Sequence, residues 1–117
     1  MKKIMIVEDI DLNSELLIQL LEDDYEIAVA KDGAEGVGLV EQFLPELVLM
    51  DISLPVMDGY EATRIIRITH PTLPIIGLSA HAMPGDAKRA VEAGFTDYLT
   101  KPVDEELLFI KLKQYLG

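Results

Sequence analysis

The feature that most constrains the fold of this chain is a repeated alternation between short apolar runs and longer segments with helical spacing of apolar residues. Each run is rich in Ile, Val, Leu or aromatic residues, as expected of strands that are buried on both faces. We predict strands near residues 3–7, 26–30, 47–50, 74–78 and 96–99. Strands that alternate with helices predict a parallel sheet whose crossover connections are helical.

Helices are predicted between these strands and after the last one. In the first helix, Leu12, Leu16 and Leu20 form one row and Leu17 and Leu21 the next, an apolar stripe at i, i+4 spacing. The other helices are delimited by cap and breaker residues, which are Asp32 and Pro45 for the second, Asp58 and His70-Pro71 for the third, Pro84 and Gly94 for the fourth, and Asp104 for the fifth.

Short connections and right-handed crossovers favour an open, doubly wound sheet of the flavodoxin-like class, with five strands in the order 2-1-3-4-5 and five flanking helices. Such sheets bind ligands beyond the carboxyl ends of their strands, where the strand order reverses. That point lies between the first and third strands, which Glu8-Asp9 and Asp51 follow. We predict a single domain over residues 1–117, because the sequence has neither a flexible linker nor a low-complexity segment.

Composition narrows the function classes. The net charge of −11 argues against direct binding to nucleic acid or to a membrane surface, which depends on clustered Lys and Arg. The absence of cysteine excludes disulfides and thiolate metal sites. The apolar part of the N-terminus is too short for a signal peptide, and no run approaches the roughly 18 apolar residues of a membrane span. We therefore expect a cytoplasmic protein.

Polar residues end four of the apolar runs, and together they predict a phosphoryl-transfer site. Three carboxylates, those of Glu8, Asp9 and Asp51, tolerate each other only if a cation or hydrogen bonds compensate. Oxygen ligands without His or Cys suit Mg²⁺. A carboxylate that attacks phosphorus forms an acyl phosphate, and Asp51 is the candidate nucleophile. The ammonium of Lys101 and the hydroxyl of Ser79 would stabilise charge on the phosphoryl oxygens.

In their order and spacing, these motifs resemble the receiver domain of two-component response regulators over the whole chain. The motifs are Val7-Glu8-Asp9, Met50-Asp51-Ile52-Ser53-Leu54-Pro55-Val56-Met57-Asp58-Gly59, Ser79-Ala80 and Tyr98-Leu99-Thr100-Lys101-Pro102. The resemblance implies phosphorylation of Asp51 by a histidine kinase or a histidine phosphotransfer protein. It also implies Mg²⁺ held by Glu8, Asp9, Asp51 and the backbone carbonyl of Ser53.

The resemblance further implies a two-state switch that signals to an unknown downstream protein. Ser79 would move toward the phosphate, Tyr98 would rotate inward, and the face made by the fourth helix, fifth strand and fifth helix would change. A cis peptide bond between Lys101 and Pro102 is implied as well. Such a receiver assists its own phosphorylation and dephosphorylation without being an enzyme for an external substrate, and it is a monomer or a weak, phosphorylation-dependent homodimer.

Two other functions stay open at this point. One is a small phosphatase or phosphotransferase with an aspartyl-phosphate intermediate, although such enzymes often carry a second Asp where this chain has Ser53. The other is a docking module that does not depend on phosphorylation. The sequence also leaves open whether the chain is a stand-alone protein or a domain of a larger kinase or regulator.

Several residues also have simpler interpretations. Asp51 alone could only initiate a turn, and Tyr98 could only pack in the core. His81 is interpreted as a loop residue near the site. Lys88 and Arg89 form a small basic spot on the fourth helix, which we interpret as a solvated face, with docking to an acidic partner as the alternative.

Overall fold

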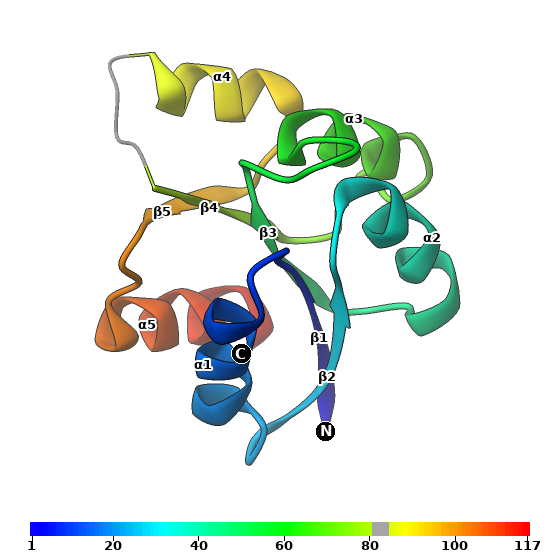
Figure 1. Cartoon of the computed structure of the whole chain (residues 1–117). Helices are drawn as coiled ribbons and strands as arrows, with labels where there is room; N and C mark the ends of the chain where they lie inside the picture. The colour runs from blue at the N-terminus through cyan, green and yellow to red at the C-terminus, as the bar shows by residue number, and fades with distance from the viewer. Residues whose placement is uncertain (81–84) are drawn as a thin grey trace.

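The computed structural model describes residues 1–80 and 85–117, and Figure 1 shows the whole chain. The elements follow one another in the order β1 (Lys2–Val7), α1 (Asp11–Leu21), β2 (Tyr25–Ala30), α2 (Gly33–Phe43), β3 (Leu47–Asp51), α3 (Gly59–Thr69), β4 (Ile75–Ser79), α4 (Asp86–Ala93), β5 (Asp97–Thr100) and α5 (Glu105–Leu116). Every predicted strand is present, and its ends lie within one or two residues of the prediction.

The five strands form one parallel sheet in the order β2-β1-β3-β4-β5, which confirms the predicted fold class. Helices α1 and α5 cover one face of the sheet, and α2, α3 and α4 cover the other (Figure 1). No helix in the described part of the chain combines the length and the apolar character needed to cross a bilayer.

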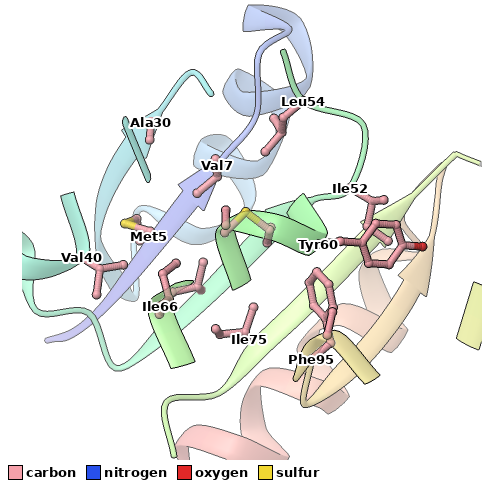
Figure 2. Close-up of a cluster of buried hydrophobic side chains, with 14 of the residues drawn as sticks. Met5, Val7, Ala30, Val40, Ile52, Leu54, Tyr60, Ile66, Ile75 and Phe95 are labelled. Carbon is pink, nitrogen blue, oxygen red and sulfur yellow. The ribbon is translucent and has the colours of Figure 1, made fainter. Parts of the chain in front are cut away.

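The two faces of the sheet are buried in two separate cores, which explains why the inner strands β1, β3 and β4 are apolar over most of their length. In β1, Met5 and Val7 belong to the core under α2, α3 and α4, whereas Ile4 and Ile6 belong to the core under α1 and α5. Figure 2 shows the first of these cores, in which residues from several strands and helices meet around Ile66. A strand between two cores cannot alternate with polar residues, because both of its faces exclude water.

The predicted helix caps are confirmed where the structure describes them. Asp32, Asp58 and Asp104 each accept a hydrogen bond from the backbone N–H three residues later, at 2.8, 2.9 and 3.0 Å. Gly94 ends α4 with a φ of 102°, a left-handed conformation that favours glycine. Pro84, the predicted start of the fourth helix, lies outside the described residues, and the described helix begins at Asp86.

The apolar stripe predicted on α1 is only partly buried, and this is a correction. Leu17 and Leu21 lie in the core at 6% and 0% exposure, but Leu12 and Leu16 are 65% and 52% exposed. The reason is geometric, because only one row of a helix can face the sheet. The other row lies along the groove that separates α1 from the segment between β5 and α5, where Leu16 and Leu20 line a cavity.

Candidate functional site

The carboxyl ends of β1, β3, β4 and β5 meet at one edge of the sheet and bring together the polar residues predicted there. Asp51 is the last residue of β3 and Ser79 the last of β4, while Glu8 and Lys101 directly follow β1 and β5. Glu8, Asp51 and Ser79 are 1%, 4% and 7% exposed. Because the strands are parallel and neighbours in the sheet, residues far apart in the sequence face a common space.

Lys101 bridges the two buried carboxylates. Its Nζ lies 2.9 Å from Glu8 Oε1 and 3.0 Å from Asp51 Oδ2. The backbone N–H of Lys101 donates to the carbonyl of Ser79 at 2.7 Å, and the Lys101–Pro102 peptide bond is cis. Two buried carboxylates cost much free energy unless a cation pairs with them, and here the ammonium of Lys101 does so.

The remaining carboxylate oxygens are held by backbone donors. Asp51 Oδ1 accepts a hydrogen bond from the N–H of Ser53 at 3.2 Å, and Glu8 Oε2 accepts one from the N–H of Asp9 at 3.1 Å. Each carboxylate therefore has one oxygen on the lysine and one on the backbone. This arrangement fixes the orientation of both groups without closing the site to a ligand.

An oxygen-rich cation site lies beside this ion pair. Glu8, Asp9 and Asp51 each offer a carboxylate oxygen, and these atoms lie within 4.8 Å of one another. Asp9 is exposed and the other two are buried, so the group opens toward solvent on one side. Clustered carboxylate oxygens with access to water suit a hard cation such as Mg²⁺, which keeps several of its waters.

The carboxylates of Asp51 and Glu8 are strongly coupled. Burial is the main cause that raises the pKa of Asp51, to about 7, and the neighbouring Glu8 carboxyl adds to the increase although Lys101 opposes it. Burial also acts to raise the pKa of Glu8, but hydrogen bonds to Asp51, Lys101 and Asn13 outweigh it, and the pKa of Glu8 is lowered. A proton that the pair takes up below about pH 7 therefore resides mainly on Asp51, and a bound cation would favour its release.

The loop from β3 to α3 passes close to Asp51 because the first residue of α3 is Gly59. A Cβ at Gly59 would lie 2.3 Å from the backbone oxygen of Asp51 and 2.8 Å from the Cα of Ile52. The N–H of Gly59 donates to the carbonyl of Ile52 at 2.9 Å, which closes the loop. Any larger residue would therefore displace the start of α3 from the site. The predicted ligand atom in this loop, the carbonyl of Ser53, stays a prediction.

Two cavities flank the site. One, of about 610 Å³, lies on the α1 side, and its lining includes Glu8, Leu16, Leu20, Lys101 and Pro102. The other, of about 290 Å³, lies on the α4 side and is lined by Ile52, Ser53, Asp58, Tyr60, Ser79, Asp86 and Arg89. The cavity on the α1 side therefore reaches Glu8 and Lys101 directly, and the cavity on the α4 side reaches Ser53 and Ser79 next to Asp51.

Three residues singled out in the sequence need separate comment. Tyr98 is half-buried and packs against the core under α3 and α4, and its predicted role in switching stays a prediction. His81 lies outside the described residues. Arg89 is exposed, as the interpretation of a solvated helix face expects, and it also stacks on the ring of Tyr60, with its guanidinium carbon 4.1 Å from the ring centroid. The sequence gives no signal for this stack, because the two residues lie on different helices.

Residues 4–113 match the family model of the response regulator receiver domain. The polar-differentiation response regulator DivK of Brucella anthropi is 36% identical over 121 residues, which cover 99% of this chain and 97% of DivK. Hybrid signal transduction histidine kinase I of Dictyostelium discoideum is also 36% identical, over 118 residues and 92% of this chain. The chain spans only 7% of the length of that kinase.

Solved structures of receiver domains are similar to this chain as well. The receiver domain of the sensor histidine kinase PA1611 from Pseudomonas aeruginosa, with a magnesium ion coordinated in its active-site cleft, has a TM-score of 0.91 and 36% identity, covering 99% of this chain and 98% of that one. The receiver domain of Ssk1 from Saccharomyces cerevisiae, in complex with the histidine phosphotransfer protein Ypd1, has a TM-score of 0.91 and 30% identity, covering 97% and 88%.

Proposed function

This chain belongs to the response regulator receiver domain family and serves phosphorylation-dependent two-component signalling, and we propose that Asp51 is its phosphoryl acceptor. The observation that supports this role is the position of Asp51 between Lys101 and the carboxylates of Glu8 and Asp9. A nucleophilic carboxylate needs a cation to hold the donor phosphate and to keep the nucleophile ionised. The ammonium of Lys101 and the cation site of Glu8, Asp9 and Asp51 would meet these two needs where the carboxyl ends of β1, β3 and β5 come together.

We propose Mg²⁺ as the cofactor, held by Glu8, Asp9, Asp51 and the backbone carbonyl of Ser53. The three carboxylate oxygens within 4.8 Å of one another fit this ion, and a magnesium ion occupies the active-site cleft of the similar PA1611 receiver domain. When bound, Mg²⁺ would neutralise charge on the phosphoryl oxygens.

Protein side chains provide the rest of the chemistry. An oxygen of Asp51 attacks phosphorus, and the leaving group departs on the opposite side. Lys101, already 3.0 Å from Asp51 Oδ2, is placed to bind a phosphoryl oxygen as negative charge spreads over the group. The hydroxyl of Ser79 donates to another phosphoryl oxygen. The same residues would assist hydrolysis of the acyl phosphate, so the domain helps its own phosphorylation and dephosphorylation.

The phosphoryl donor in our proposal is a histidine kinase or a histidine phosphotransfer protein. The similar Ssk1 receiver domain forms a complex with the phosphotransfer protein Ypd1. On this chain, Ile10, Leu12 and Leu16 form an apolar strip, 52%, 65% and 52% exposed, and Leu16 lines the cavity that reaches Lys101. We assign this apolar strip to docking of the donor, because it places a partner directly against the phosphoryl acceptor.

Phosphorylation would then be transmitted through Ser79 and Tyr98 to the face formed by α4, β5 and α5. Ser79 ends β4 and pairs in register with Thr100 of β5, and Tyr98 pairs with Gly77. A movement of Ser79 toward the phosphate would therefore act on both strands beneath α4 and α5. We propose that an unidentified downstream protein binds this face in the cytoplasm, and that the domain is a monomer or a weak phosphorylation-dependent homodimer.

The test is phosphorylation of the purified protein by acetyl phosphate with Mg²⁺, followed by intact-mass measurement. We expect one phosphoryl adduct on the wild-type protein and on Asp23→Asn, a control at an exposed turn. Asp51→Asn should carry none. An adduct that persists in Asp51→Asn, or that forms equally in EDTA, would contradict the proposed function.

A further inference from the structure

The cavity on the α4 side of the site shares two residues with the phosphoryl-acceptor site. Ser53 donates its N–H to Asp51 Oδ1, and Ser79 ends the strand next to Asp51. Both residues also line this cavity of about 290 Å³. A small molecule with its phosphoryl group in front of Asp51 could therefore place its other end in this cavity, between α3 and α4.

One cationic side chain, Arg89, lies among the described residues that line the cavity. Its guanidinium stacks on Tyr60, which is only 5% exposed and packs edge-on against Phe95, with ring centroids 6.0 Å apart (Figure 2 shows both rings). A ring fixed in the core holds the guanidinium in place, so binding a ligand costs Arg89 little conformational entropy.

Acidic residues also line the cavity, but one of them is already engaged. The carboxylate of Asp58 accepts a hydrogen bond from the N–H of Glu61 at 2.9 Å and so points at the start of α3. Asp86 lies in the first turn of α4.

Arg89 presents a planar fork of donors, the group that best binds a carboxylate by two parallel hydrogen bonds.

A carboxylate is what a small acyl phosphate releases. When an oxygen of Asp51 forms its bond to phosphorus, the bond between phosphorus and the acyl oxygen breaks, and its electron pair leaves on that oxygen. The product is a carboxylate anion, and no proton is needed. A phosphohistidine donor instead releases an imidazole nitrogen, which carries no negative charge once it is protonated.

Resting on the proposed role of Asp51, we propose that the cavity between α3 and α4 binds the carboxylate leaving group of small acyl phosphates, and that Arg89 is the residue that binds it. Arg89 thereby selects among phosphoryl donors. It favours those that leave as carboxylates, and it gives no advantage to donors whose leaving group is neutral.

The experiment compares two small donors at subsaturating concentration with Mg²⁺, using intact mass to follow the adduct. Acetyl phosphate releases acetate, whereas phosphoramidate releases neutral ammonia, because its nitrogen is already protonated. We expect Arg89→Gln to lower the second-order rate constant for acetyl phosphate roughly two- to fivefold, the size of one partly exposed charge interaction, and to leave that for phosphoramidate unchanged. Arg89→Lys should restore part of the loss.

The matched control is Lys88→Gln, which makes the same change of charge on the neighbouring exposed residue of α4 and should alter neither rate constant. Equal slowing of both donors by Arg89→Gln would overturn the inference, since it would indicate a general effect on the site. No slowing of either donor would overturn it too. If the wild-type protein accepts no phosphoryl group from either donor, the proposed function fails, and this inference fails with it.

Discussion

Replacing Asp51 by Asn should stabilise the protein when no divalent cation is present. The carboxylate of Asp51 is almost fully buried beside that of Glu8, and its pKa is raised from 3.8 to about 7, first by burial and then by Glu8. Keeping this group ionised at pH 8 costs the folded state roughly 4 kcal/mol relative to the unfolded chain. Asn has the same shape but no charge, so it avoids this cost.

Water at the open edge of the sheet screens part of the repulsion, and we expect a gain of about 2 kcal/mol or more in the free energy of unfolding. For 117 residues, an unfolding entropy of about 2.1 cal/mol/K per residue converts each kcal/mol into about 4 °C. The midpoint of thermal unfolding of Asp51→Asn should therefore lie about 8 °C or more above that of the wild-type protein at pH 8 in EDTA.

The stability difference between Asp51→Asn and the wild-type protein should grow as pH rises. Because the pKa of Asp51 is higher in the folded than in the unfolded state, the folded protein holds an extra proton between about pH 3.8 and pH 7. The free energy of unfolding of the wild-type protein therefore falls as pH rises through that range. Asp51→Asn lacks this titrating group, so its free energy of unfolding does not fall for this reason. The gap between the two proteins should be small near pH 4.5 and largest above pH 7.

Urea and thermal denaturation at pH 4.5 and pH 8, with Asp23→Asn as the control, measure this effect. Addition of Mg²⁺ should narrow the gap at pH 8, because a cation that binds only the folded wild-type site stabilises it. An Asp51→Asn protein that is no more stable than the wild type at pH 8, or a gap that does not change with pH, would refute the account of the site's electrostatics.

The other predictions concern the start of α3, the metal site and the apolar strip of Ile10, Leu12 and Leu16. Gly59→Ala should destabilise the fold by roughly 3 kcal/mol in urea denaturation, because its Cβ would overlap the backbone at Asp51. The control is Gly38→Ala, where a Cβ meets nothing within 4 Å, and it should stabilise α2 slightly. Asp9→Asn should weaken Mg²⁺ binding about tenfold in calorimetry, equivalent to about 1.4 kcal/mol. Because Asp9 is exposed, the same change should leave the unfolding midpoint in EDTA unchanged. An unchanged Mg²⁺ affinity would contradict the role of Asp9 as a ligand. Leu16→Ser should slow phosphoryl transfer from a phosphorylated histidine phosphotransfer domain but not from acetyl phosphate. The control is Ile68→Ser, at a residue 80% exposed on α3, which should slow neither transfer. Equal slowing by both variants would argue against docking at α1.

Strand positions and helix caps could be predicted because their signals are local. The apolar runs of β1 and β3 have no polar face, and Asp32, Asp58 and Asp104 each cap the helix that follows them in sequence. The grouping of Glu8, Asp51, Ser79 and Lys101 could also be predicted, because the order of strands in a doubly wound sheet brings those strand ends to one edge.

Features that depend on packing between helices could not be predicted. Five leucines in α1 satisfy a helical stripe, and only the contact of α1 with the sheet decides that Leu17 and Leu21 are buried while Leu12 and Leu16 are exposed. The stack of Arg89 on Tyr60 joins α4 to α3 and leaves no pattern in the sequence. The pKa of Asp51 likewise depends on burial and on Glu8, far away in the sequence.

The central claim is that the phosphoryl group resides on Asp51, and its location can be measured directly. Reduction of the phosphorylated protein with borohydride converts an aspartyl phosphate into homoserine, which marks the position permanently. After digestion and fragment mass spectrometry, we expect homoserine at position 51 and at no other acidic residue. Homoserine at Asp9 or Asp58, 5-hydroxynorvaline (the product of a reduced glutamyl phosphate) at Glu8, or a phosphoryl group that borohydride does not remove would contradict the account.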